Sequence, residues 1–359
     1  MKHLLVYFTK TLHLNPLFKE LVEEKLKEYR LYVDEYIVLD VNTANLDFFI
    51  NLQDSKYTHI SIITEESSFC IVNKFLATMN ESELIQSDDD FILKDNLKYQ
   101  NSSLLIKLND KFVNILKAKD YFLPEFLYED TMMNVFYILD DDFDGVNVIL
   151  NTQAKPYGVK VYVFNLFNGL ICVNIFKEKF SHLDGFMQSV RALFDKKIIE
   201  EINVFSFILN KLKEKNKTIT FAESCTAGAL VNEFSKLDGC SNILMASVVT
   251  YSVNSKKQWL KIDDYCANNV YSNECTIAMA KGALALTKAD YAISTTGLLG
   301  KDDFNEIKSG DVFICVANNE KNISKKLKLN SSRALMQKEC ALACAVLLLD
   351  FDKELFFNE

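Results

Sequence analysis

Short apolar runs that alternate with amphipathic helical patterns are the feature that most restricts the fold of the first third of this chain. Residues 3–9, 35–40 and 58–64 are predicted strands, and a helical pattern follows each of them. Strands that alternate with helices favour a parallel sheet that is covered by helices on both faces. We therefore predict a three-layer α/β domain over residues 1–125.

The pattern changes in the middle of the chain. Residues 126–202 predict a small α+β module, in which strands joined by turns at Gly158 and Gly169 precede an amphipathic helix over 182–198. Residues 203–359 return to alternating helices and strands, which predicts a second α/β domain. The length of 359 residues agrees with this division, since it exceeds that of a typical single domain.

Composition argues against several functional classes. The chain is 49% hydrophobic and 25% charged, as in globular proteins, and its net charge of −9 without a basic stripe argues against direct nucleic-acid binding. The nine cysteines include no CxxC pair and no histidine at ligand spacing, which is typical of reduced thiols in a cytoplasm, so we predict no metal and no other cofactor. The longest apolar runs are shorter than a membrane span, and the first run lacks a cleavage site, so we expect no membrane segment.

The segment TFAESCTAG at 220–228 carries the strongest chemical signal. An apolar strand ends there and small residues lead into a helix, which would expose the Ser224 hydroxyl above the sheet edge. The amides that open the helix would face the same space and could bind an oxyanion or a phosphate, and Gly228 would permit a close approach of backbone or ligand. Two alternatives remain: Glu223 and Ser224 could simply cap the helix, and Cys225 could be a rival nucleophile, although such a thiol is more often buried and inert.

The histidines limit which base could activate a serine in this region. All four lie at or before His182, so a Ser–His–Asp triad confined to the last domain is impossible. The remaining common solution is a lysine whose pKa is lowered by burial or by a neighbouring cation. Lys256 in the segment YSVNSK is the candidate, because it follows a predicted strand that ends at Tyr251. A solvated helix lysine is the ordinary alternative.

Two further segments could complete a pocket. The segment STTGLLG at 294–300 ends a predicted strand in a loop punctuated by glycines, which could face a ligand through Thr296 and Gly297. Arg333, at the start of the last predicted helix, could reach a phosphate or carboxylate through its planar set of donors. An ordinary surface arginine is the alternative there.

These segments, in this order, resemble the CinA carboxy-terminal domain, the nicotinamide-nucleotide amidase family. The family motif AESCTGG corresponds to AESCTAG at 222–228, and V(T/A)YSNxxK corresponds to VTYSVNSK at 249–256. The family stretch GAVSxxxxxxMAxGA corresponds to 269–283, and it is followed by the Thr296-Gly297 loop, by Gly310 before a strand and by Arg333. The resemblance covers about residues 203–349.

The resemblance implies hydrolysis of the carboxamide of nicotinamide mononucleotide to nicotinic acid mononucleotide and ammonia, without a metal. It implies that Ser224 is the nucleophile, Lys256 the general base and Tyr251 a partner in proton transfer. It also implies a homodimer or another homo-oligomer, and a set of substrate-binding residues: Glu223, Thr226, Gly228, Thr296, Gly297 and Arg333.

The chain departs from the family pattern at positions that shape the substrate pocket. The family loop TGIAGPDGG appears as TGLLGKDDF at 296–304, which loses the proline and two glycines. Ala227 replaces the first glycine of AESCTGG, Val253 replaces the asparagine of YSN, and a GG pair before the tyrosine strand appears as AS at 246–247. These changes affect the positions that shape the substrate and leave Ser224, Tyr251 and Lys256 in place.

The first 202 residues resemble the rest of a full-length CinA protein in an eroded form. They resemble a molybdopterin-binding-like domain over 1–125 and a KH-like linker module over 126–202. The family start IGDE appears as VYFT, and the phosphate loop GGLGPTxDD appears as TEESSF, where Glu65 and Glu66 replace the loop glycines and add negative charge. We therefore expect that a pyrophosphatase or pterin site has been lost.

The alternative to an amidase is a catalytically impaired CinA-like binding or assembly protein linked to competence or DNA damage. The altered loops favour this alternative, whereas the retention of Ser224, Tyr251 and Lys256 together favours the enzyme.

Overall fold

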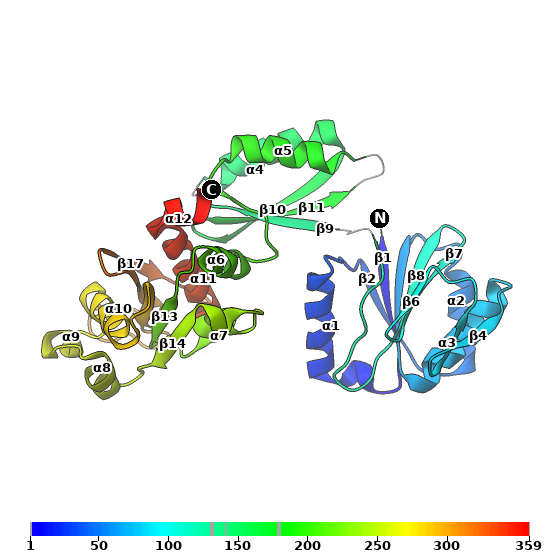
Figure 1. Cartoon of the computed structure of the whole chain (residues 1–359), viewed down its shortest axis with the longest axis horizontal. Coiled ribbons are helices and arrows are strands. Elements are labelled where there is room, and N and C mark those ends of the chain that lie inside the picture. The colour runs from blue at the N-terminus through cyan, green and yellow to red at the C-terminus, as the bar shows by residue number, and fades with distance from the viewer. Residues whose placement is uncertain (1, 130–132, 141, 178–180, 359) are drawn as a thin grey trace. The chain divides into compact units, whose positions relative to one another are not determined.

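The computed structural model describes residues 2–129, 133–140, 142–177 and 181–358, and they form a mixed α/β protein with several sheets, the class that the sequence predicted (Figure 1). The described chain divides into two compact units. One unit comprises residues 1–134, 153–161 and 174–186, and the other comprises 135–152, 162–173 and 187–359. No helix among the described residues is long and apolar enough to cross a membrane.

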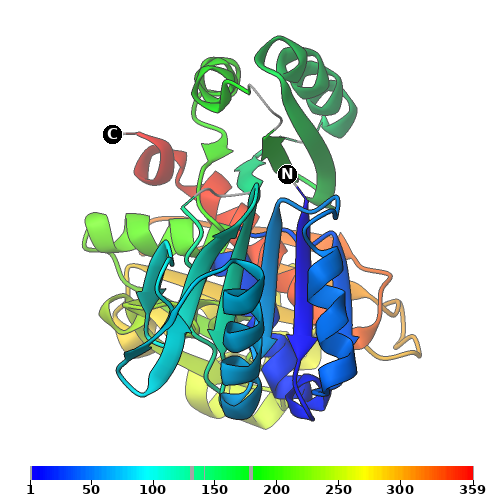
Figure 2. The same cartoon turned by 90° about the vertical axis from the view of Figure 1, so that its right-hand side faces the viewer.

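The first sheet has six strands in the order β2-β1-β3-β8-β7-β6 (Figure 2). The first four in this order are parallel to their neighbours, and β7 and β6 complete the sheet in antiparallel fashion. This arrangement contains the three strands that the alternation predicted. The strands are β1 (His3–Phe8), β2 (Glu35–Leu39), β3 (His59–Thr64), β6 (Lys98–Gln100), β7 (Ser103–Leu108) and β8 (Lys111–Lys117).

Helices cover both faces of this sheet because its buried strands are apolar on both sides. Leu4, Val6 and Phe8 pack in one cluster with α2 (Asp47–Asn51) and α3 (Glu66–Met79). Leu5 and Tyr7, whose side chains alternate to the other face, pack against α1 (Pro16–Glu28). The antiparallel hairpin β4 (Leu84–Ser87) and β5 (Asp90–Leu93) lies outside this sheet. The likeness of this region to molybdopterin-binding domains stays a prediction.

The middle of the chain forms a four-stranded sheet in the order β10-β11-β9-β12, with α4 (Phe143–Ala154) and α5 (Leu183–Leu193). The helix predicted over 182–198 is wrong at its end. Ile198 and Ile199 form strand β12 and pair with Ile138 and Tyr137 of β9, which ends the helix earlier. The strands are β9 (Met133–Ile138), β10 (Val159–Phe167), β11 (Leu170–Lys177) and β12 (Ile198–Ile199). The KH-like designation and the domain boundaries at 125 and 202 stay predictions.

The last sheet has five strands in the order β14-β13-β15-β16-β17. Strands β14 and β15 run parallel to β13, whereas β16 and β17 are antiparallel. The carboxyl ends of the three parallel strands therefore meet at one edge, where ligands commonly bind in open α/β sheets. The strands are β13 (Ile219–Glu223), β14 (Leu244–Val249), β15 (Tyr291–Gly297), β16 (Asp311–Ala317) and β17 (Asn322–Lys328).

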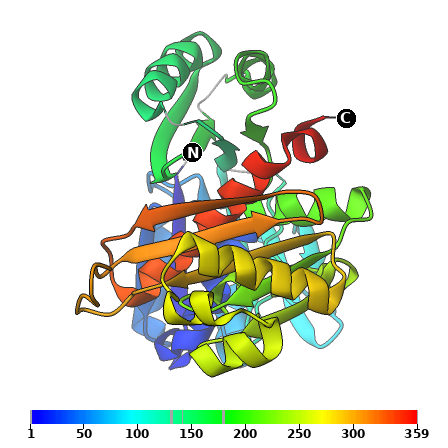
Figure 3. The same cartoon turned by 90° about the vertical axis from the view of Figure 1, so that its left-hand side faces the viewer.

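Successive side chains of β13 direct two helical layers to opposite faces of this sheet. Phe221 belongs to a cluster with α6, α7, α11 and the short α12, whereas Ala222 belongs to a cluster with α8, α9 and α10. Figure 3 shows α10, in yellow, lying across the sheet. The helices are α6 (Val204–Glu214), α7 (Ala229–Ser235), α8 (Val253–Leu260), α9 (Asp264–Asn268), α10 (Asn273–Thr287), α11 (Arg333–Phe351) and α12 (Lys353–Phe357).

Candidate active site

The turn after β13 places Ser224 at the carboxyl edge of the last sheet. The strand is fully buried and ends at Glu223, and Ser224 itself is 7% exposed. Ala227 and Gly228 then adopt left-handed backbone conformations, with φ of 52° and 99°, before α7 begins. Two successive left-handed residues turn the chain sharply, which favours small side chains at both positions.

The carboxylate of Glu223 caps α7 from inside the protein. It accepts hydrogen bonds from the amides of Gly228 at 2.8 Å, Leu230 at 3.2 Å and Val231 at 2.9 Å, and the residue is fully buried. Glu223 therefore occupies three of the amides that open α7, and the expectation that amides of this turn bind an oxyanion or phosphate stays a prediction for the amides that precede them. The capping alternative holds for Glu223, and its predicted contact with substrate stays a prediction.

Lys256 meets Ser224 because β13 and β14 are neighbours. Glu223 pairs in register with Val249, so Ser224 and Thr250 leave the sheet side by side. The Ser252 hydroxyl then caps α8, whose first turns carry Lys256 back over the sheet edge. The Lys256 Nζ lies 2.9 Å from the Ser224 Oγ and donates to the Thr250 carbonyl at 2.6 Å.

The environment of Lys256 favours its neutral form. Its side chain is 2% exposed, and burial lowers the pKa of Lys256 below the usual 10.5. No carboxylate within the described residues forms an ion pair with it. A neutral amine that donates one hydrogen to the Thr250 carbonyl can present its lone pair to the Ser224 hydroxyl, which is the arrangement that a general base requires.

Tyr251 and Arg333 form a second pair at this edge. The Arg333 Nη2 donates to the Tyr251 hydroxyl at 2.8 Å, and Ser332 caps the first turn of α11 in front of Arg333. Tyr251 is 60% exposed. Of the contacts that the described residues make with its hydroxyl, none involves Ser224 or Lys256, so its role in proton transfer stays a prediction.

A cavity of about 230 Å³ lies between these pairs. Its lining comes from the turn after β13, from α8 and the residues just before it, and from the segment before α10. The end of β15 with the loop that follows it, and the start of α11, complete the lining. None of the described lining residues is acidic, and two, Lys256 and Arg333, are basic. The lining residues are Ser224, Cys225, Tyr251, Val253, Lys256, Val270, Tyr271, Gly297, Leu298, Leu299, Gly300 and Arg333.

Three of the predicted binding residues besides Glu223 lie outside this lining. The Thr226 hydroxyl lies 2.7 Å from the Thr295 hydroxyl in the interior, and the Thr296 hydroxyl donates to the Val270 carbonyl at 2.9 Å. Gly228 serves the left-handed turn. Buried partners already satisfy the two hydroxyls, and the predicted contacts of these three residues with substrate stay predictions.

Several lining residues were missed by the sequence analysis. Tyr271 directly precedes Ser272, whose hydroxyl caps α10. A capping serine indicates a turn before a helix, and this was the local signal that could have drawn attention to Tyr271. Leu298 and Leu299 lie within the glycine-punctuated loop, but apolar side chains carry no separate signal for a pocket. Thr295, rather than Thr296, supports the Ser224 turn through its hydroxyl.

Cys225 is a poor rival nucleophile. The side chain of Cys340 and burial raise the pKa of Cys225 well above 9.0, which disfavours the reactive thiolate. Among the residues that the structure describes, no three His, Cys, Asp or Glu side chains gather in a way that suits a metal ion.

Comparison with known proteins identifies the last domain. Residues 202–351 match the CinA C-terminal domain. A CinA-like protein of Endomicrobium trichonymphae is 36% identical over 130 residues, which cover 35% of this chain and 30% of that protein. A CinA-like protein of Thermotoga maritima is 28% identical over 235 residues, which cover 62% of this chain and 52% of that protein.

A crystal structure of the competence damage-inducible protein A from Klebsiella pneumoniae is 22% identical, with a TM-score of 0.40, and the match covers 44% of this chain and 97% of that one. The matched part of the chain spans between about a quarter and a half of the length of its sequence relatives. The resemblance stated from the sequence is confirmed for the last domain: the chain contains a CinA C-terminal domain at residues 202–351.

Proposed function

We propose that the chain hydrolyses the carboxamide of nicotinamide mononucleotide to nicotinic acid mononucleotide and ammonia. The observation that carries this proposal is the buried pair of Ser224 and Lys256, whose Oγ and Nζ are 2.9 Å apart at the edge of a cavity. Membership of the last domain in the CinA family supports the same reaction class. The cytoplasmic location that we also propose is supported by the nine free cysteines, which suit a reducing compartment.

The geometry supports a two-step acyl transfer. Neutral Lys256 takes the proton of Ser224 as its Oγ attacks the carboxamide carbon, and the resulting ammonium gives that proton to the departing nitrogen, which leaves as ammonia. Water then attacks the ester carbon while Lys256 accepts a proton from it, and Ser224 leaves as a hydroxyl when the proton returns to its oxygen. The products are free Ser224, neutral Lys256 and the carboxylic acid.

The turn after Ser224 supplies donors for the tetrahedral oxyanion. The amide of Thr226 donates to no acceptor in the described part of the chain, and the amide of Cys225 contacts only the thiol of its own side chain. Both precede the three amides that Glu223 occupies. We propose that these two amides stabilise the oxyanion, a contribution that is commonly worth about a hundredfold to a thousandfold in rate per donor.

The charges around the cavity suit a substrate that carries a phosphate. Arg333 donates one N–H group to Tyr251 and has other N–H groups with which it could bind a phosphate. The described lining contains no acidic side chain that would repel a phosphate. Tyr251 would thereby help to hold the guanidinium in place. Its part in proton transfer stays a proposal that rests on the family resemblance.

The test is the release of ammonia from nicotinamide mononucleotide by the purified chain. Ser224→Ala and Lys256→Ala should each lower kcat about a thousandfold or more. Lys257→Ala is the matched control, since Lys257 is the next residue, is exposed and pairs with Asp264 on the surface. Absence of ammonia with the wild-type chain, or equal rates in all variants, would refute the amidase.

The same experiment separates the alternative function. The altered loop at 296–304 favours a catalytically impaired binding or assembly protein. That reading predicts that the nucleotide still shifts the thermal unfolding of the wild-type chain although no ammonia is released. Ammonia release that depends on Ser224 and Lys256 would exclude it.

One contact supports the proposal that the first region has lost an anion site. The Glu65 Oε1 accepts from the amides of Thr11 and Leu12 at 3.4 and 3.3 Å, in the turn that follows β1. The chain's own carboxylate thus takes donors that an external anion would need. The molybdopterin-binding-like and KH-like designations of the first two regions remain part of this proposal.

We also propose a homo-oligomer. Its support is the edge strand β14, on which Met245 is 53% exposed and Val249 40% exposed. Exposed apolar side chains on an unpaired edge are a common place for association. Light scattering coupled to gel filtration tests this directly, and a monomer at micromolar concentration would contradict it.

A further inference from the structure

Tyr271 is a cavity residue to which neither the family motif nor the proposed chemistry assigns a role. It is half-buried and lines the cavity that Ser224 and Lys256 share. Its backbone is fixed on both sides, because the Thr296 hydroxyl donates to the carbonyl of Val270 and the Ser272 hydroxyl donates to that of Asn269 at 2.7 Å. The segment that carries the ring is therefore held in place beside the cavity.

Phe304 packs against this ring from the loop after β15. The two ring centroids are 6.0 Å apart with an interplanar angle of 78°, an edge-to-face arrangement that is favourable for aromatic pairs. Phe304 and Ile307 exchange backbone hydrogen bonds of 2.9 and 3.0 Å, so Phe304 stands on a small hairpin. Asn305 closes the hairpin in a left-handed conformation.

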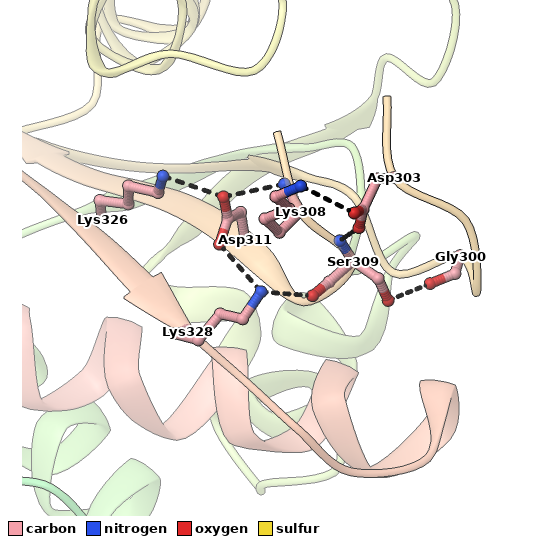
Figure 4. A network of polar contacts seen from close by, with 7 residues as sticks. All are labelled: Gly300, Asp303, Lys308, Ser309, Asp311, Lys326 and Lys328. Atoms are coloured by element: carbon pink, nitrogen blue, oxygen red, sulfur yellow. Dashed lines mark hydrogen bonds and ion pairs between the residues drawn. The ribbon is translucent and has the colours of Figure 1, made fainter. Parts of the chain in front are cut away.

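The base of this hairpin is fixed by a polar network (Figure 4). Asp303 accepts from the Ser309 amide at 2.8 Å and pairs with the Lys308 ammonium at 3.1 Å. The buried Asp311 accepts from the Lys308 amide at 3.1 Å and pairs with Lys326 at 2.9 Å and Lys328 at 3.3 Å. The Ser309 hydroxyl donates to the carbonyl of Gly300, which joins the hairpin base to the cavity lining.

The rest of this wall is apolar. Four aliphatic residues line the cavity together with Tyr271: Val253, Val270, Leu298 and Leu299. Their side chains have no polar groups that could form hydrogen bonds with a ligand. A planar ring gains dispersion from such a surface, and a positively charged ring gains in addition from an aromatic neighbour. The pyridinium ring of nicotinamide mononucleotide is both planar and positively charged.

We infer that Tyr271, supported by Phe304, is a specificity-determining residue that recognises the aromatic, cationic ring of the carboxamide substrate. The inference rests on the proposed function and adds the residue that distinguishes aromatic from non-aromatic carboxamides. Tyr271 takes no part in bond making or breaking. Its contribution therefore lies in binding the ring and not in the rate of the chemical step.

The test compares two ligands that differ only in the ring. Oxidised nicotinamide mononucleotide has an aromatic cationic ring, whereas the reduced form has a non-aromatic neutral ring with the same carboxamide, ribose and phosphate. Each is titrated calorimetrically into the full chain with Ser224→Ala, which prevents turnover. Tyr271→Val in this background should weaken binding of the oxidised form about threefold to tenfold and that of the reduced form by less than about twofold.

Two further variants and one control define the result. Tyr271→Phe should restore the preference for the oxidised form, and Phe304→Ala should reduce it in the same direction as Tyr271→Val. Phe304 is 55% exposed, so we expect Phe304→Ala to fold. This variant therefore tests the contribution of the aromatic pair even if Tyr271→Val fails to fold. Tyr265→Val is the matched control, since Tyr265 is 65% exposed and lies outside the described cavity lining.

Activity measurements separate this inference from the proposed function. With Ser224 intact, Tyr271→Val should raise KM for oxidised nicotinamide mononucleotide and leave kcat within about twofold. A chain that releases ammonia but whose Tyr271→Val and Phe304→Ala variants keep the wild-type preference would overturn the inference alone. A wild-type chain that releases no ammonia and binds neither nucleotide would overturn the proposed function, and the inference with it.

Discussion

Lys256 combines a buried amine with a hydroxyl partner, and this determines how the proposed activity should depend on pH. Burial lowers its pKa below 10.5, and only the neutral amine can accept the proton of Ser224. The value of kcat/KM should therefore rise with pH up to that lowered pKa, with about a tenfold gain per pH unit below it. A pH series of ammonia release from nicotinamide mononucleotide measures this limb.

Lys256→Arg is the sharpest variant for this dependence. Arginine stays protonated at every accessible pH, so it keeps the charge but cannot serve as the base, and activity should fall about a thousandfold. The matched exposed substitution, Lys257→Arg, should leave both the rate and the pH profile unchanged. Substantial activity with arginine at position 256 would show that the positive charge, not proton transfer, is what the site uses.

The Ser224–Lys256 pair could be predicted from the sequence because both residues follow the ends of strands that pair in parallel. The lack of a histidine in the last domain left lysine as the candidate base. The sequence left two roles open for Glu223, because a carboxylate next to a candidate nucleophile looks the same in sequence whether it faces a ligand or caps a helix. The Arg333–Tyr251 hydrogen bond joins residues 82 positions apart, and only the fold could show it.

At the scale of elements, the short helix α7 depends on one internal acceptor. Glu223→Gln removes the charge and one acceptor oxygen from a site that serves three amides, so the free energy of unfolding should fall by about 1–3 kcal/mol. Urea unfolding measures the change. Glu233→Gln, at a partly exposed position of the same helix, should stay within about 0.5 kcal/mol, and equal effects at the two positions would contradict the capping role.

The loop between β15 and β16 depends on the charge of Asp311. Burial alone would raise the pKa of Asp311, but Lys326, the Lys308 amide and Lys328 together lower it below 3.8. Because the folded-state pKa is lowered, the stabilisation is present above about 3.8, the unfolded value, and is lost as pH falls through the folded value. At neutral pH the ionised Asp311 should therefore hold the loop with its full set of contacts.

Asp311→Asn should release this loop at neutral pH. The loss of charge-assisted hydrogen bonds is worth about 1 kcal/mol here, so trypsin should cleave after Lys301 and Lys308 about fivefold faster. Mass spectrometry of the fragments gives the rates. Glu306→Gln, in an exposed part of the same loop, should cleave at the wild-type rate, and protection that persists in Asp311→Asn would assign the loop's order to other contacts.

The sequence predicted the elements better than their ends. Of the first sheet, the sequence predicted β1, β2 and β3, and β1 and β3 were found because their apolar runs are uninterrupted. The helix over 182–198 was extended too far, because Ile198 and Ile199 continue an apolar pattern that suits a helix and a strand equally well. Their pairing with β9 is a tertiary interaction, and the local pattern of apolar residues does not indicate it.

At the scale of the whole molecule, the core of the last domain extends before residue 203. One apolar cluster contains residues of α6, α7 and α11 and also Tyr137, Leu170, Cys172 and Ile199 from the middle sheet. The Tyr137 hydroxyl donates to the Ile202 carbonyl at 2.7 Å, which ties the same sheet to the start of the domain. A fragment of residues 203–359 would retain the candidate site but lose these four members of the apolar cluster.

We therefore expect a fragment of residues 203–359 to melt about 5 °C or more below a fragment of residues 133–359. Each large apolar side chain that loses its partner forfeits about 1.5–3 kcal/mol, and about 1 kcal/mol shifts the melting temperature of a domain of this size by a few degrees. Calorimetry of both fragments measures the difference. Equal melting temperatures would show that the shared cluster is dispensable and that the CinA C-terminal domain is stable alone. A lower melting temperature for the fragment of residues 203–359 would show that the middle sheet stabilises the last domain. The distance between Ser224 and Lys256 depends on the fold of that domain.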